Sequence, residues 1–242
     1  MLNVTDPNNF GRTVAGLSLI IAPVALAVGE IVRLGVFGGA SGERELLAAV
    51  AADPGLWQLQ TVINMVSVIL FVPAVWGMIH LARGRSPVVA HVGGTLAMVG
   101  VLGAAGHNVF GNVLTGGMVA VENGVPAMET LGVEMEQTPG FLLVLLMFIV
   151  GFVLGFIVLA VALYRSRTVG RLPAAAIIAA MLVFFTAGES LPLTMVSSAL
   201  FILGMGSVAR RTLSMSDAEW ADGSPALSTA AVPAPTGAAR LS

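Results

Sequence analysis

Four long, predominantly apolar stretches constrain this 242-residue chain more than any other feature of its sequence. They cover residues 13–37, 58–81, 88–116 and 140–164. A helix needs about 20 residues to cross a hydrocarbon core about 30 Å thick, and each stretch exceeds that length. The first is longer than the roughly 7–15 apolar residues of a signal peptide, so we expect it to stay in the protein. The sequence therefore predicts an all-α, polytopic transmembrane helix bundle.

The composition supports this fold class and excludes several others. Hydrophobic residues make up 57% of the chain and charged residues 10%, and the mean hydropathy is +0.94. Soluble domains carry about 25% charged residues, so a water-soluble enzyme or a nucleic-acid-binding protein is excluded. The chain has no Cys, which excludes disulfides, thiolate metal sites and iron–sulfur clusters. All eleven cationic residues are Arg, so Schiff-base chemistry on Lys is excluded as well.

The apolar stretch 172–209 is too long for one membrane crossing. A straight helix of 38 residues would measure about 57 Å at about 1.5 Å per residue. The sequence Gly188-Glu189-Ser190-Leu191-Pro192 places a helix breaker at its centre. We therefore expect two short spans, residues 173–187 and 192–208, joined in a tight hairpin.

The arginines determine the predicted topology. Arg near the ends of spans is retained on the cytoplasmic side. With six spans, only Arg44 lies in an outer loop, and Arg33 lies near an outer helix end. Eight arginines fall on the cytoplasmic side: Arg12, Arg83, Arg85, Arg165, Arg167, Arg171, Arg210 and Arg211. We therefore predict six spans in the plasma (inner) membrane with both termini cytoplasmic. Five spans are the alternative, but they would export Arg210 and Arg211.

The chain divides into a short polar start at residues 1–12, the bundle at 13–209 and a tail at 210–242 that we expect to be disordered in the cytoplasm. Two outer loops, near 42–53 and 126–137, have amphipathic patterns and are expected to be short helices, each followed by a Pro-Gly turn. The two hairpins that contain them repeat the same order of features. This order fits either a duplicated hairpin or the general pattern of membrane hairpins.

Several motifs in the first half of the chain resemble a known group of proteins. They are GERELL at 42–47, AADPGLWQ at 51–58, PAVWG at 73–77 and RGR at 83–85. Together they resemble uncharacterised small multipass membrane proteins of GC-rich bacteria, over about the first 110 residues. This resemblance implies a membrane protein and carries over no activity, cofactor, partner or functional residue.

Polar residues inside the predicted spans are the candidate functional residues, because such residues are costly in lipid and face the bundle interior. Glu30, Asn64, His107 and Glu189 all lie in the outer half, about 7–12 Å from the midplane of their spans. With Arg33 and Asn108 they could form an outward-facing pocket that binds a cation such as zinc or relays protons. The alternative is structural, with Glu30 and Arg33 simply paired one turn apart.

Two other sets of residues suggest further hypotheses. His80 and His91 lie near the cytoplasmic ends of adjacent spans and could be axial ligands of a b-type haem, although interfacial histidines near headgroups explain them as well. Gly151 and Gly155 form a G-x-x-x-G motif, which favours close helix packing, either inside the bundle or between two copies.

No catalytic motif is present in the sequence, and we lean against an enzyme. The function we expect is that of a membrane-embedded accessory or binding protein. A proton-coupled or small-molecule transporter is the alternative, followed by a haem protein or an intramembrane enzyme. No cofactor is expected, with haem or a divalent cation as the alternatives. The expected partners are the lipid bilayer and a membrane protein or second copy of the chain, and no nucleic acid.

Overall fold

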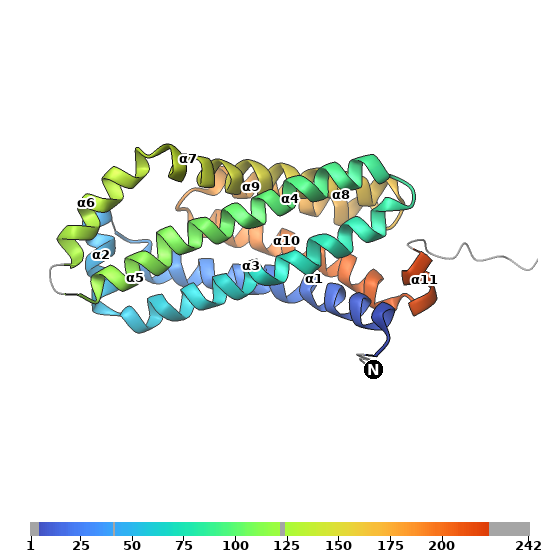
Figure 1. The fold of residues 1–242 in the computed structure, drawn as a ribbon, viewed down its shortest axis with the longest axis horizontal. Helices are drawn as coiled ribbons and strands as arrows, with labels where there is room; N and C mark the ends of the chain where they lie inside the picture. The colour runs from blue at the N-terminus through green and yellow to red at the C-terminus, as the bar shows by residue number, and fades with distance from the viewer. Residues whose placement is uncertain (1–4, 41, 122–123, 223–242) are drawn as a thin grey trace, which may run out of the picture.

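The computed structural model describes residues 5–40, 42–121 and 124–222, and these residues form helices joined by short turns (Figure 1). Three of the long helical rods contain a π-helical segment: η1 (Arg33–Phe37) extends α1, η2 (Val109–Val113) joins α4 to α5, and η3 (Met147–Gly151) joins α7 to α8. The α-helices that build the bundle are α1 (Pro7–Val32), α3 (Pro54–Arg83), α4 (Pro87–Asn108), α5 (Leu114–Val119), α7 (Pro139–Leu146), α8 (Phe152–Arg165), α9 (Arg171–Ala187) and α10 (Leu191–Ser214). The all-α bundle expected from the sequence is confirmed.

Five of the rods are long and apolar enough to cross a membrane: Pro7–Phe37, Pro54–Arg83, Pro87–Val119, Pro139–Arg165 and Leu191–Ser214. The sixth, α9, is apolar but has 17 residues, which corresponds to about 25 Å. The long stretch 172–209 is broken where the sequence indicated. Gly188 ends α9 with φ +50°, a conformation that glycine adopts without strain.

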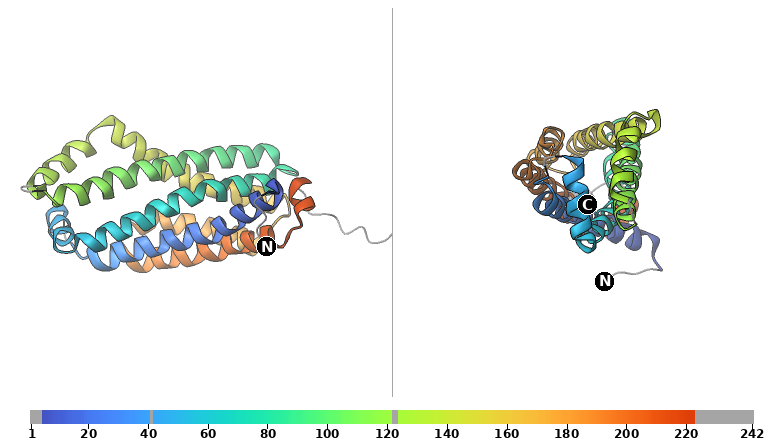
Figure 2. Two further views of the ribbon diagram at one scale, coloured as in Figure 1. Left: turned by 60° about the horizontal axis from the view of Figure 1, so that its bottom comes forward. Right: turned by 90° about the vertical axis from the view of Figure 1, so that its left-hand side faces the viewer.

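The six rods form a closed ring. Along the chain each rod packs on the next, from α1 and α3 through α4, α8 and α9 to α10, and α10 packs back on α1 (Figure 2). The start of α1 and the end of α10 therefore lie together at what we call the terminal end of the bundle. The opposite end, which we call the capped end, carries α2 (Glu43–Ala52) and α6 (Gly124–Glu136) (Figure 1).

Glycines bring α4 and α8 into close contact. A Cβ added to Gly100 would collide with the backbone of Gly151 and Phe152, and one added to Gly155 would collide with the backbone of Ala97. The G-x-x-x-G motif of Gly151 and Gly155 thus packs inside the chain. Such close backbone approach is typical of helices packed through small residues.

Four phenylalanines fill the middle of the ring. We call Phe71, Phe152, Phe156 and Phe201 the phenylalanine cluster; all four are at most 3% exposed. The ring centroids of Phe71 and Phe152 are 5.3 Å apart and those of Phe156 and Phe201 are 5.2 Å apart, in edge-to-face geometry. Because these residues come from α3, α8 and α10, the cluster joins opposite walls of the ring.

At the capped end, the two expected amphipathic helices are present as α2 and α6, and they pack on each other and on α5. The Pro-Gly turns that follow them start the next rods. The Asp53 carboxylate accepts a hydrogen bond from the Leu56 N–H at 3.0 Å, and Pro54 occupies the first helical turn. Thr138 and Pro139 do the same for α7, since Thr138 Oγ1 accepts from the Phe141 N–H.

At the terminal end, the structure corrects the expectation of a disordered tail from residue 210. Helix α10 continues to Ser214, and a short helix α11 (Asp217–Asp222) follows. A reciprocal capping box begins α11: Ser216 N–H donates to Glu219, and the Glu219 N–H donates to Ser216 Oγ. Trp220 anchors α11 and is 2% exposed. One large apolar residue forms no hydrophobic period, so the sequence pattern does not indicate this helix. The rest of the expected tail, 223–242, lies outside the described residues.

Candidate functional site

Arg33 joins two carboxylates that come from distant parts of the chain. Its Nε donates to Glu30 Oε2 and its Nη1 donates to Glu189 Oε2, each at 3.0 Å. Glu30 lies one turn before Arg33, whereas Glu189 comes from the turn between α9 and α10. We call Glu30, Arg33 and Glu189 the ion triad. The expected pair of Glu30 and Arg33, one turn apart, is therefore present, and Arg33 has a second partner, Glu189, from another hairpin.

Two amides of α3 extend the ion triad. Asn64 Nδ2 donates to Glu30 Oε1 at 3.3 Å and to Gln60 Oε1 at 3.1 Å. Both amide residues are buried, with Asn64 4% and Gln60 0% exposed. Sequence reasoning missed Gln60. Its spacing of four residues from Asn64, which puts both amides on one helix face, was a signal that could have identified it. Gly29 permits this contact, because a Cβ there would collide with the Asn64 side chain.

His107 and Asn108 lie on the α4 wall. The His107 ring stacks on Phe148 with centroids 5.4 Å apart. Its Nδ1 has no hydrogen-bond partner among the described residues, nor do the side-chain oxygens of Asn108 and Asn64. These three buried atoms therefore retain hydrogen-bonding capacity that the described chain does not use.

The three π-helical segments border this group of residues. η1 begins at Arg33, η2 follows directly after Asn108, and η3 carries Phe148, the stacking partner of His107. π-helical turns widen a helix locally and occur frequently at functional sites. Each of these segments thus carries or adjoins a residue of the site.

A small cavity of about 20 Å³ adjoins Glu30 between α1, α8, α9 and α10. This volume corresponds to room for about one water molecule. Its walls include the Glu30 side chain, hydroxyl groups of α10 and aromatic rings, contributed by Thr194, Ser197, Ser198, Phe152, Phe184 and Phe201. Exposure rises toward the α9–α10 turn: the side chain is 22% exposed for Glu30 and 70% for Glu189. The ion triad is therefore reached by solvent from the side of Glu189.

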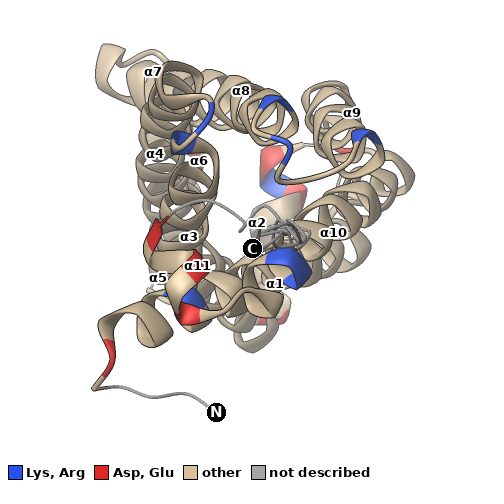
Figure 3. Cartoon of the chain, turned by 90° about the vertical axis from the view of Figure 1, so that its right-hand side faces the viewer, with Lys and Arg blue, Asp and Glu red and all other residues tan. Residues whose placement is uncertain are grey.

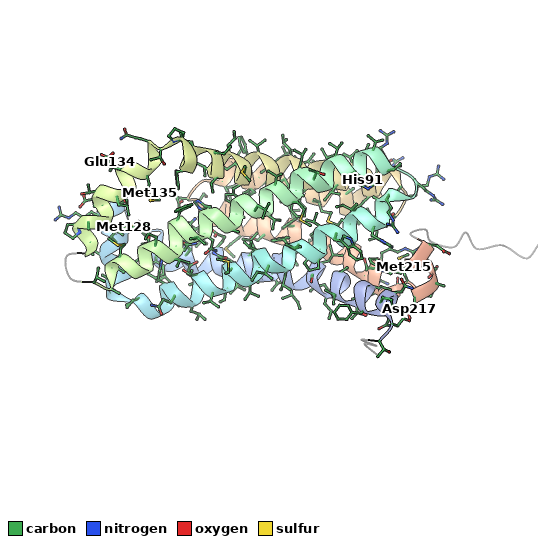
Figure 4. All side chains as sticks on the ribbon, in the orientation of Figure 1. His91, Met128, Glu134, Met135, Met215 and Asp217 are labelled. Atoms are coloured by element: carbon green, nitrogen blue, oxygen red, sulfur yellow. The ribbon has the colours of Figure 1, made fainter. Side chains whose placement is uncertain are left out.

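The two histidines considered as haem ligands have different surroundings. His80 is buried, its Nε2 is hydrogen-bonded to the Trp220 carbonyl, and its ring stacks on Trp220 with centroids 4.2 Å apart. His91 is exposed at the terminal end, where its Nδ1 contacts the Pro87 carbonyl at 2.7 Å (Figure 4). In the described ranges, no group of three or more His, Asp or Glu residues could hold a metal ion.

Comparisons with protein-family models, curated proteins and solved structures found no match to this chain. Function is therefore inferred from the site itself. Two carboxylates, a guanidinium group and two amides inside a helix bundle can bind a small polar molecule through charge-assisted hydrogen bonds. The hydroxyl groups of α10 add further acceptors beside Glu30.

Proposed function

We propose that this protein is a multipass protein of the plasma (inner) membrane that binds a small polar ligand at the ion triad, with entry from the outer side. The observation that carries the proposal is the meeting of the partly buried Glu30 and Arg33 with Glu189, which is largely exposed. Ionised residues within membrane spans are costly and face a bundle interior or a water-filled cavity. Their placement at a solvent-reached position favours ligand binding over a purely structural role.

The distribution of arginine supports the proposed orientation. The terminal end carries the short basic turns of the bundle, with Arg83 at the end of α3, Arg85 just after it and Arg165 at the end of α8 (Figure 3). Short loops rich in Arg remain in the cytoplasm, so the terminal end is assigned to the cytoplasm. The capped end and the Glu189 side of the ion triad then face outward.

The phenylalanine cluster supports binding rather than free passage. It fills the ring between the ion triad and the terminal end, and its four side chains are almost completely buried. A ligand that reached the ion triad from the Glu189 side would meet this cluster. A transporter is the second candidate. A ring of helices with a site on one side of a central aromatic barrier could open that site first to one face of the membrane and then to the other.

The proposal can be tested by thermal unfolding of the detergent-purified protein. The probes are n-butylamine hydrochloride, glycine, sodium acetate and sodium chloride, at equal ionic strength. A ligand that binds only the native state raises the unfolding midpoint by mass action. We expect at least one probe to do so in the wild type, and the rise to be reduced in Glu30→Gln and His107→Ala.

The matched control is Glu134→Gln, which removes an exposed carboxylate on α6 at the capped end (Figure 4). This variant should respond as the wild type does. An identical response to every probe in all four proteins would contradict the proposal.

A further inference from the structure

The cavity beside Glu30 combines three kinds of group that recognise a protonated amine. We propose that this cavity holds the primary ammonium group of an amine ligand whose remaining part extends toward Glu189. This inference rests on the proposed function and names its ligand class.

The carboxylate of Glu30 supplies the charge. Each of its oxygens already accepts one hydrogen bond, Oε1 from Asn64 and Oε2 from Arg33. A carboxylate has about four lone-pair sites, so both oxygens can still accept. The ion triad contains two carboxylates and one guanidinium, so its formal charge is −1. A ligand with one positive charge would make the occupied site neutral, which favours a cation over an anion.

The hydroxyl groups of α10 supply further acceptors. Thr194 and Ser197 are 6% and 4% exposed, and with Ser198 they line the same cavity as Glu30. Ser197 Oγ donates its proton to the Ala180 carbonyl at 2.9 Å, so its lone pairs are free to accept. A primary ammonium has three N–H donors, and Glu30 and these hydroxyl residues are the acceptors that the lining offers it.

Aromatic rings complete the lining. Phe152, Phe184 and Phe201 border the same cavity, and the ring centroids of Phe152 and Phe184 are 6.2 Å apart. The faces of aromatic rings attract cations, most strongly where water is excluded. An anion would have no comparable partner on this wall.

The size of the cavity selects among cations. About 20 Å³ accommodates a group of the size of a water molecule, which a primary ammonium matches. A quaternary ammonium carries four carbon substituents around the charge and does not fit. Glu30, which lines the cavity, is 22% exposed and is joined through Arg33 to Glu189, which is 70% exposed. The carbon chain of a primary amine therefore has an exit in that direction.

The test compares n-butylamine hydrochloride, tetramethylammonium chloride and sodium chloride as probes of thermal unfolding, at equal ionic strength. We expect butylammonium alone to raise the midpoint of the wild type, by at least about 2 °C at a concentration well above its dissociation constant. Thr194→Val, which removes one acceptor and keeps the side-chain shape, should shift the half-saturating concentration upward several-fold. Ser198→Leu, which fills the cavity and leaves the ion triad intact, should abolish the response.

The outcomes separate this inference from the proposed function. Stabilisation by glycine or acetate, but not by butylammonium, would overturn the amine and leave a polar ligand site in place. Equal stabilisation by sodium chloride would assign an inorganic cation and also overturn the amine. An unchanged butylammonium response in both Thr194→Val and Ser198→Leu would place the amine elsewhere. Failure of every probe in the wild type would contradict the proposed function itself.

Discussion

Arg33 and Glu189 are 156 residues apart in sequence, and their side chains form a 3.0 Å ion pair. This pair ties the end of the first long rod to the turn of the last hairpin. Because α10 also packs along α1, the pair closes the ring at the level where Glu30 and Asn64 are hydrogen-bonded. The site therefore exists only when the first and last hairpins are assembled.

Removing Arg33, which breaks both ion pairs, should cost more stability than removing the charge of Glu189, which breaks one. Arg33→Ala leaves Glu30, which is 22% exposed, without its ion pair, and we expect a loss of about 1–3 kcal/mol in the free energy of unfolding. Glu189 is 70% exposed, so Glu189→Gln should cost less than about 1 kcal/mol. Unfolding of detergent-purified variants by denaturant measures both. A larger loss in Glu189→Gln than in Arg33→Ala would contradict the described burial.

The contact between α4 and α8 should be intolerant of even one methyl group. A Cβ at Gly100 would meet the α8 backbone, which cannot move as a side-chain end can, so Gly100→Ala should destabilise the protein by about 1–3 kcal/mol. Gly117 in α5 has nothing within 4 Å of an added Cβ, and Gly117→Ala is the matched control. We expect this control to be neutral or stabilising by up to about 1 kcal/mol. Equal unfolding midpoints for the two variants would contradict the packing.

Helix α11 should be held in place by Trp220. This side chain stacks on His80 and lies near Trp76, with centroids 5.9 Å apart, while Asp217 pairs with Arg12 at 3.0 Å. Trp220→Ala should release the segment after Ser214 by local unfolding, with a smaller effect on the whole bundle. Limited proteolysis should then cut this segment several-fold faster, and Trp220→Phe should largely preserve protection. Protection unchanged in Trp220→Ala would show that the anchor lies elsewhere.

Topology reporters should place the turns of the terminal end on one side of the membrane. Reporters inserted after Gly84 and fused after Arg211 should both read cytoplasmic, because the flanking arginines are retained there. A reporter inserted after Gly42, at the capped end, should read external. If the reporter after Arg211 read external while that after Gly84 read cytoplasmic, α9 would not cross the membrane and five spans would be correct.

The local elements of this protein follow from its sequence. Long apolar runs have no stable state in lipid other than helix, because every backbone N–H and C=O must be satisfied within the segment. Gly188 ends α9 for an equally local reason, its positive φ, and Asp53 and Thr138 start the next helices through caps that act over three residues. Such interactions depend only on neighbours in the chain, so the sequence indicates them directly.

The tertiary structure decided which of the polar residues meet. Spacing alone allowed Glu30 to pair with Arg33, but it did not reveal that Glu189 shares Arg33 or that Gln60 supports Asn64. Helix α11 was missed for the same reason, since Trp220 is buried by α1 and α3 rather than by its own segment. These contacts depend on which rods are neighbours in the ring of six. This arrangement is set by the sum of many packing contacts along whole helices, such as those of Gly100 with α8, and no single local pattern encodes it.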